Sequence, residues 1–196
     1  MRIQQFLGLV VALVLALPAF SQEPTSTNGK YMAGSVPVVD GQVRFSETYT
    51  AEGRSAGQIY AALKDFTQKT LAEGKDALPK ARITEADSLG GQLVASIEEY
   101  LYFKRKAWTM DRVRFSYQII YHISDGSFTV EMRRLRYTYD DVPEPEELYA
   151  EDWITDAEAL TRDGKALTKK AGKFRRFTID RKDEIFRGAQ EAALRN

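Results

Sequence analysis

Two adjacent acidic residues, Glu98 and Glu99, are the side chains of this sequence best suited to catalysis. Glu99 has the same parity as five apolar residues that alternate around it: Leu93, Ala95, Ile97, Leu101 and Phe103. Burial favours the protonated form of a carboxyl group, which can then act as a general acid. A β-bulge at this point would instead turn both acids to water and bring Tyr100 and Tyr102 inside. We favour the bulge, so a hydrolase that uses Glu99 is the last of three candidate functions.

Other residue types that carry catalysis are scarce. His122 is the only histidine and the chain has no cysteine, which excludes histidine-rich and thiolate metal sites, disulfides and a lipid-modified N-terminal cysteine. The sequence also contains no phosphate-binding loop, no Gly-x-Ser-x-Gly motif and no dinucleotide-binding fingerprint. We therefore expect no cofactor and no metal, and we interpret His122 as a surface residue.

Arginine and tyrosine residues between positions 112 and 139 form the candidate binding surface. Guanidinium groups beside aromatic rings suit anionic or glycan-like ligands. The members are Arg112, Arg114, Arg133, Arg134, Arg136, Tyr137 and Tyr139, and Trp108 is added as a residue type common at interfaces. The alternative is an exposed sheet face that these charges keep soluble.

A second candidate surface is the basic segment from Lys169 to Arg176. It could contact anionic lipid or polysaccharide, or it could pair with the acidic stretch from Asp140 to Asp152 of the same chain. Over the whole sequence, 28 basic residues balance 28 acidic ones. A net charge of zero gives no general attraction to nucleic acid, so we expect no nucleic-acid partner.

An antiparallel sheet is predicted to position these side chains. Long strands are expected at residues 92–104, 112–123 and 127–139, where apolar and polar residues alternate and so give one buried and one wet face. Asp40-Gly41 and Asp125-Gly126 predict hairpin turns. In the last long strand the parity of the apolar residues changes at Arg133-Arg134, which predicts a bulge. A short strand is also expected at residues 82–87.

Helices are predicted before and after the long strands in the sequence. Ser55 and Gln58 form a capping box for the first helix, and Gly74 is expected to end it in a left-handed conformation. Later helices are expected from Thr155 or Asp156 to about Lys170, and from Arg181 to Leu194. The predicted class is α+β: about five antiparallel strands with a helix on one face, in the order β-α-β-β-β-β-α, plus a C-terminal helical extension.

The N-terminus has the layout of a cleavable signal peptide. Arg2 precedes the apolar run at residues 6–17, and the small residues Ala19 and Ser21 fit cleavage before Gln22. The alternative, a membrane anchor, is disfavoured because Pro18 ends the run short of about 20 residues. The expected organisation is a signal peptide at 1–21, a flexible leader at 22–34, a domain at 35–141, and an acidic loop with a basic helical extension at 142–196. The expected location is periplasmic or secreted.

Several segments resemble a family described as a domain of unknown function with a TBP-like fold, found in secreted proteins of Gram-negative gut anaerobes. The similar segments are the Val-Asp-Gly hairpin, the helix start at Ser55 with Gln58-Ile59-Tyr60, the strand end RLRYTYDD, and the tail segments WITDAEAL and GKFRRFTID. The resemblance implies the TBP-like fold. It implies no catalytic residues, and a fold shared with a DNA-binding protein does not by itself imply DNA binding.

Three functions follow from these observations. The first is an exported, non-enzymatic binding or interaction module of the bacterial envelope, whose partner is an envelope protein, a glycan or an anionic lipid. The second is a carrier that holds a small apolar ligand between helix and sheet, in a cavity lined by Phe66, Tyr117 and Tyr121. The hydrolase built on Glu99 is the third.

Overall fold

The computed structural model describes residues 29–106, 109–139 and 144–195. The expected signal peptide and Trp108 therefore lie outside the described residues. The strands are β1 (Val38–Val39), β2 (Gln42–Thr50), β3 (Arg82–Asp87), β4 (Gln92–Lys106), β5 (Thr109–Ser124), β6 (Ser127–Tyr139) and β7 (Glu146–Tyr149). The helices are α1 (Ala56–Phe66), α2 (Asp156–Ala159) and α3 (Ala171–Leu194), with short turns η1 (Gly29–Tyr31), η2 (Thr67–Ala72) and η3 (Ala150–Asp152).

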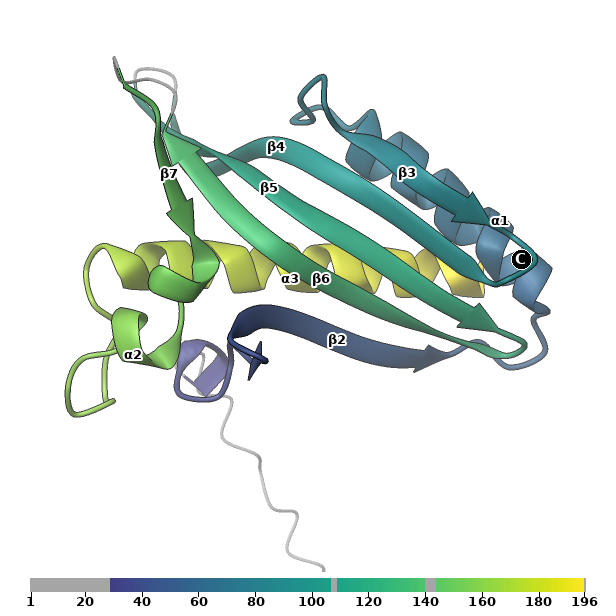
Figure 1. Ribbon diagram of the computed structural model, residues 1–196, viewed down its shortest axis with the longest axis horizontal. Helices are drawn as coiled ribbons and strands as arrows, with labels where there is room; N and C mark the ends of the chain where they lie inside the picture. Colours follow the sequence, from purple (N-terminus) through teal and green to yellow (C-terminus); the bar gives the residue numbers. More distant parts are fainter. Residues whose placement is uncertain (1–28, 107–108, 140–143, 196) are drawn as a thin grey trace, which may run out of the picture.

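The strands form one antiparallel sheet in the order β1-β2-β6-β5-β4-β3, with β7 paired to β6 beyond the end of β2 (Figure 1). The α+β class and the three long strands are confirmed. The sheet has seven strands rather than about five. The predicted order counted the Asp40-Gly41 hairpin, which contains β1 and β2, as one strand. It did not include the four-residue β7, because a segment so short carries little periodicity.

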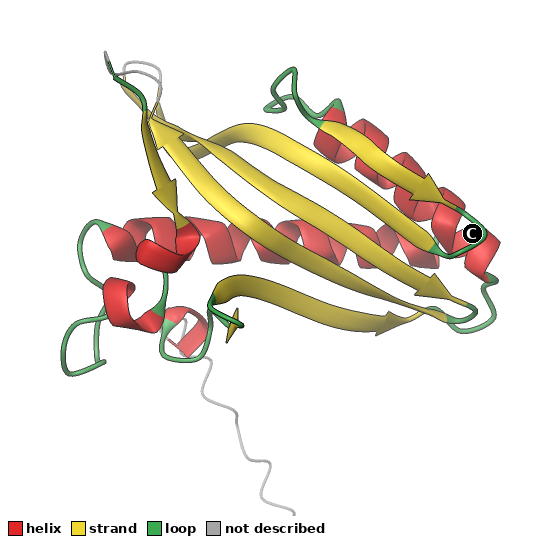
Figure 2. Cartoon of the chain, in the orientation of Figure 1, coloured by secondary structure: helices red, strands yellow, loops and turns green. Residues whose placement is uncertain are grey.

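Both long helices lie on the same face of the sheet (Figures 1 and 2). Side chains of α3, among them Phe174, Ile185 and Phe186, are part of the same core as the buried residues of β4, β5 and β6. The helix α1 packs beside α3, where a Cβ added to Gly188 would come within 2.8 Å of the Phe66 ring. The C-terminal segment that was expected to be an extension thus supplies one of the two long helices that cover the sheet.

The last two helices differ from their predicted bounds. Helix α3 begins at Ala171, ten residues before the predicted start at Arg181, because Phe174, Thr178 and Ile179 continue its buried face. The helix expected from Thr155 to Lys170 is limited to α2. After α2 the chain turns back on itself at Gly164, which has a φ of +67°, and Leu160 pairs with Leu167.

Local signals in the sequence give most of the turns. Asp40 and Gly41 have φ angles of 51° and 76°, as the predicted hairpin turn requires, and the Ser55–Gln58 capping box is formed. Gly74 was predicted wrongly, since it is not among the residues with positive φ. It is needed for close packing instead, because a Cβ there would lie 2.2 Å from the Thr70 carbonyl oxygen.

One predicted bulge is confirmed and the other is wrong. The register between β5 and β6 shifts between Ser116 and Gln118, opposite the extra residue at Arg134. In β4, by contrast, pairing with β5 is regular from Gln92 to Tyr102, and the irregularity falls at Phe103. Glu99 therefore keeps the inward parity of its apolar neighbours and is only 4% exposed.

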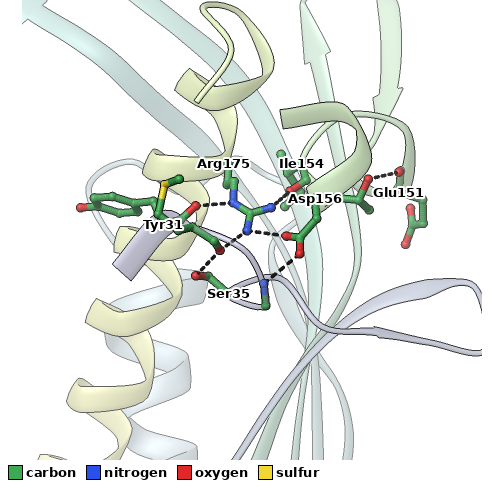
Figure 3. A network of polar contacts seen from close by, with 9 residues as sticks. Tyr31, Ser35, Glu151, Ile154, Asp156 and Arg175 are labelled. Carbon is green, nitrogen blue, oxygen red and sulfur yellow. Dashed lines mark hydrogen bonds and ion pairs between the residues drawn. The ribbon is translucent and has the colours of Figure 1, made fainter. Parts of the chain in front are cut away.

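A fully buried arginine, Arg175, attaches the N-terminal segment to α3 (Figure 3). It donates hydrogen bonds to the carbonyl oxygens of Tyr31 (2.7 Å), Met32 (2.6 Å) and Ile154 (2.8 Å), and to a carboxylate oxygen of Asp156 (2.7 Å). Part of the segment expected as a leader therefore contacts the domain: the carbonyl oxygens of Tyr31 and Met32 accept from Arg175, and the backbone N–H of Gly34 donates to Asp156.

The basic segment 169–176 does not pair with the acidic stretch 140–152 in the described residues. Lys173 forms an ion pair with Asp111, and Arg175 forms one with Asp156. Both partners lie outside that stretch. In the described part of the acidic stretch, Glu151 accepts the backbone N–H of Val43 and joins η3 to β2.

Candidate binding surface on the uncovered sheet face

The face of the sheet opposite α1 and α3 carries no helix of the described residues (Figure 2). Alternation along β4 and β5 places even-numbered residues on this face and odd-numbered residues against the helices. The polar residues of these two strands on this face include Gln92, Ser96, Glu98, Tyr100, Tyr102, Arg112, Arg114, Ser116, Gln118 and His122. The sequence thus builds a wide polar surface on the most regular part of the fold.

Cross-strand register aligns four side chains across this face. Glu98 in β4 is opposite Ser116 in β5, which is opposite Arg136 in β6, which is opposite Tyr149 in β7. Arg136 is therefore near the middle of the row. Its position depends on the bulge at Arg134, because the extra residue changes the parity of β6 beyond it.

A first hollow, with a volume of about 520 Å³, lies over β4, β5 and β6 beside β7. Its charged lining consists of Lys80, Glu98, Arg114, Arg136 and Glu147. Two ion pairs cross it, Arg114 to Glu98 at 3.6 Å and Arg136 to Glu147 at 4.0 Å. Both separations exceed hydrogen-bond distances. The Arg136–Glu147 pair is also exposed, at 48% and 51%, and such pairs add little stability, so Arg136 can exchange this partner for a ligand.

A second hollow, of about 440 Å³, adjoins the first at Arg136. It lies where β6 leaves β2, after the Arg44–Arg133 pair, and begins to pair with β7. Arg134 lines this hollow with a φ of 56°, a left-handed conformation that costs a non-glycine residue roughly 1 to 2 kcal/mol. Tyr149 lines it too and is 46% exposed.

Arginine side chains stack on tyrosine rings at the end of this face nearest the β4–β5 hairpin. The guanidinium carbon of Arg112 lies 3.8 Å from the Tyr100 ring centroid, and that of Arg105 lies 4.3 Å from the Tyr102 centroid. Such cation–π contacts hold both partners in place. These stacked pairs lie beyond the first hollow, whose lining does not include them.

The structure brings most of the predicted binding residues together. Arg112, Arg114, Arg133 and Arg136 lie on the uncovered face, Arg133 donating to Gln118, and Arg134 lies on the bulge. Trp108 lies outside the described residues.

The two predicted binding tyrosines are corrected. Tyr137 is 0% exposed, stacks on Phe115 and shares a hydrogen bond with Thr178 of α3. Tyr139 is half-buried against Phe174. The reason is the bulge at Arg134, which sends the odd-numbered residues after it toward the helices.

The predicted set did not include several residues of this surface, among them Glu98, Ser116, Tyr149 and Lys80. Alternation places both Glu98 and Ser116 on the wet face, but neither was assigned to the binding surface. Tyr149 and Lys80 could not be placed there by alternation, because Tyr149 belongs to a short acidic strand and Lys80 to a loop. Nothing local in either segment shows that it folds against the sheet face.

The Glu99 carboxylate lies on the other face, beneath α3, in a cluster of three side chains. Its two oxygens accept hydrogen bonds from Arg181 at 2.8 and 2.7 Å, and one also accepts from the Tyr117 hydroxyl at 2.8 Å. Burial and the adjacent Glu99 raise the pKa of the Tyr117 hydroxyl well above its usual value. Glu99 thus accepts three hydrogen bonds, which is the geometry of an ion-pair partner and not of a general acid.

Two of the three side chains expected to line a space for an apolar ligand are packed in the core, whereas the third, Phe66, lines two hollows of about 190 and 370 Å³ beside α1. Tyr117 is 2% and Tyr121 0% exposed, and the Tyr121 hydroxyl accepts a bond of 3.4 Å from Thr67. The rings of Phe115, Tyr117 and Tyr137 pack against each other in the same layer. Neither hollow of the binding surface is lined by Tyr117 or Tyr121. The packing therefore gives the carrier function no support.

Within residues 29–106, 109–139 and 144–195, no three histidine, aspartate or glutamate side chains are grouped as metal ligands. No helix in those ranges has the length and apolar character needed to cross a membrane.

Comparisons with known proteins give the family. The family model described as a domain of unknown function (DUF4468) with TBP-like fold matches residues 45–138. The crystal structure of a DUF4468 family protein from Bacteroides ovatus ATCC 8483 is 32% identical in sequence, with a TM-score of 0.77 over 86% of this chain and 96% of that chain. The chain belongs to the DUF4468 family. None of the curated proteins matches it.

A second solved structure supports the fold of this DUF4468 protein. A TBP-like protein from Parabacteroides distasonis ATCC 8503 aligns with a TM-score of 0.64 at 20% identity, over 81% of this chain and 96% of that chain. The resemblance seen in the sequence and the TBP-like α+β fold are thus confirmed. The DUF4468 match runs from β2 to β6 and includes Arg114, Arg134 and Arg136, but it ends before β7.

Proposed function

We propose that this protein is an exported, non-enzymatic binding module of the bacterial envelope, and that its ligand occupies the uncovered sheet face around Arg136. The observation that carries the proposal is the pair of hollows that meet at this residue. Concave sites with a few convergent polar groups are where proteins bind ligands. On the same face the Arg136–Glu147 pair is exposed and 4.0 Å apart, whereas the Glu99 carboxylate on the opposite face accepts three hydrogen bonds within the fold, although Glu99 and Arg181 also line a hollow of about 590 Å³.

Export is supported by the sequence of residues 1–21. The single charge, the apolar run and the small residues before Gln22 are the parts that a signal peptidase requires. When the full chain is expressed in a Gram-negative host, the protein recovered from the periplasm or medium should begin at Gln22 by N-terminal sequencing. Recovery of the intact chain from the cytoplasm alone would contradict export.

Ligand capture tests the binding surface. Residues 22–196 are immobilised and exposed to an envelope extract, and the retained proteins, glycans and lipids are quantified together. Arg136→Gln should reduce the retained ligand at least tenfold, because it removes the guanidinium group that lines both hollows. The side chain is 48% exposed, so the substitution should change stability by no more than about 0.5 kcal/mol.

The matched control is Arg162→Gln, which makes the same change at an exposed arginine of the loop after α2. It should retain ligand as the unmodified chain does. Equal capture by the Arg136→Gln and Arg162→Gln variants would show that the ligand does not bind at Arg136 and would contradict the proposed binding surface.

A further inference from the structure

We propose that the ligand is a neutral oligosaccharide that lies across both hollows, with one part of the chain on each side of Arg136. This inference rests on the proposed function, since it names the ligand of that same surface. It is carried by the balance of charges in the two hollows, by their arrangement, and by two side chains of the second hollow.

The described lining of the two hollows is electrically balanced. Four cationic side chains face four carboxylates, namely Lys80, Arg114, Arg134 and Arg136 with Glu98, Glu147, Glu151 and Asp152. A polyanion would be attracted by the first set and repelled by the second, so the surface discriminates against it. A hydroxyl group both donates and accepts hydrogen bonds, so a neutral polyhydroxylated ligand can bond with both sets.

The arrangement of the hollows favours a chain over a single small molecule. Each volume, about 520 and 440 Å³, is by itself sufficient for a small ligand. Arg136 lines both, so a ligand that fills the two must pass this side chain. A chain of linked sugar units has the required length and repeats the same hydroxyl groups in each hollow.

An extended peptide fits this surface less well. Peptides that bind to sheets add a strand at an edge, where main-chain N–H and C=O groups are free to pair. The two hollows lie on the face of the sheet, and β6 is paired on both sides, with β5 and with β2 or β7. Side chains are therefore the main contacts that this face offers.

Tyr149 supplies an apolar platform in the second hollow. Its ring is 46% exposed beside Arg136. The C–H face of a sugar ring can pack on an aromatic ring, while the arginine donates to hydroxyl groups at the edge of the sugar. A neutral sugar thus uses the apolar and the polar parts of the hollow together.

Arg134 is kept in a strained backbone conformation at the same place. A glycine would adopt a φ of 56° without strain, yet the position carries a long cationic side chain that lines the hollow. Strained residues and bulges concentrate at ligand sites, where they aim a side chain that a regular strand would direct elsewhere. We assign Arg134 to ligand contact.

The test uses defined oligosaccharides. Isotope-labelled residues 22–196 are titrated with neutral homo-oligosaccharides of glucose, mannose, galactose and N-acetylglucosamine, each with two and with six sugar units, and with a six-unit uronic acid chain. At least one neutral six-unit chain should bind ten times more tightly than its two-unit form and more tightly than the acidic chain. Its amide shift changes should include Gln42, Arg136 and Tyr149.

Equal affinity for the two lengths, tighter binding of the acidic chain, or no binding of any neutral chain would overturn the inference. The proposed function is tested separately, because capture from the extract that depends on Arg136 would stand in each of these cases. If capture also fails to depend on Arg136, both are overturned.

A substitution separates the roles of Arg134 in folding and in binding. Arg134→Gly should weaken binding of the neutral six-unit chain at least tenfold, while the midpoint of thermal unfolding stays the same or rises, because glycine accepts the positive φ. Arg134→Lys, which keeps a cation, should bind more tightly than Arg134→Gly. Unchanged affinity in Arg134→Gly would show that the Arg134 side chain does not contact the ligand.

Discussion

Replacing Arg175 by methionine should lower the free energy of unfolding by about 3 kcal/mol or more. The guanidinium group is fully buried and bonds three backbone carbonyl oxygens as well as Asp156. Methionine fills a similar volume but donates no hydrogen bond. Each carbonyl left without a donor costs roughly 1 kcal/mol or more when it stays buried. Urea unfolding followed by circular dichroism measures the change.

Arg176→Met is the matched control, since it makes the same substitution at the exposed neighbouring residue of α3. It should change stability by no more than about 0.5 kcal/mol. Hydrogen exchange gives a second readout, because the amides of residues 32–36 should lose protection in Arg175→Met before those of β5. A stability loss equal to that of Arg176→Met would show that Arg175 does not hold the N-terminal segment.

Arg175 also shows where prediction from the sequence ends. Hairpin turns, the Ser55–Gln58 cap and three long strands were predicted correctly, because each depends on residues close together in the chain. The run Lys173 to Arg176 is typical of a solvated surface. Its third member is buried only because carbonyl groups from residues 31–32 and 154 meet at one point of the fold. Nothing within the run indicates this meeting.

The candidate site was predicted in the same uneven way. Strand alternation alone located Arg112 and Arg114 on a polar face, and Arg136 joins them because of the bulge at Arg134. The same alternation, carried past the bulge, should have placed Tyr137 inside. The second hollow depends on β7 and on the change of partner along β6, which is a property of the sheet and not of any one segment.

Glu99 was misjudged for a related reason. Its parity indicated burial, and a carboxylate on a buried face made a bulge preferable in the absence of a visible partner. The partner is Arg181, which is 82 residues later and lies on a helix whose start was predicted ten residues too late. The inward position that parity gave Glu99 was right. Its carboxylate can be buried because the guanidinium group of Arg181 pairs with it.

The Glu99–Arg181 pair should therefore contribute strongly to stability. Arg181→Met should lower the free energy of unfolding by about 3 to 5 kcal/mol, because it leaves the Glu99 carboxylate buried with the Tyr117 hydroxyl as its remaining donor in the cluster. The control is Arg187→Met on the same helix, whose side chain is 68% exposed and whose loss should have an effect of no more than about 0.5 kcal/mol.

A double substitution identifies the cause of that loss. Glu99→Gln combined with Arg181→Met removes the buried charge along with its partner, so the double variant should be more stable than Arg181→Met alone. If the two effects simply add, the stability loss comes from packing of the arginine stem and not from an unpaired carboxylate. Glu99→Gln alone should leave ligand capture on the opposite face of the sheet unchanged, whereas a hydrolase built on this residue would lose its activity.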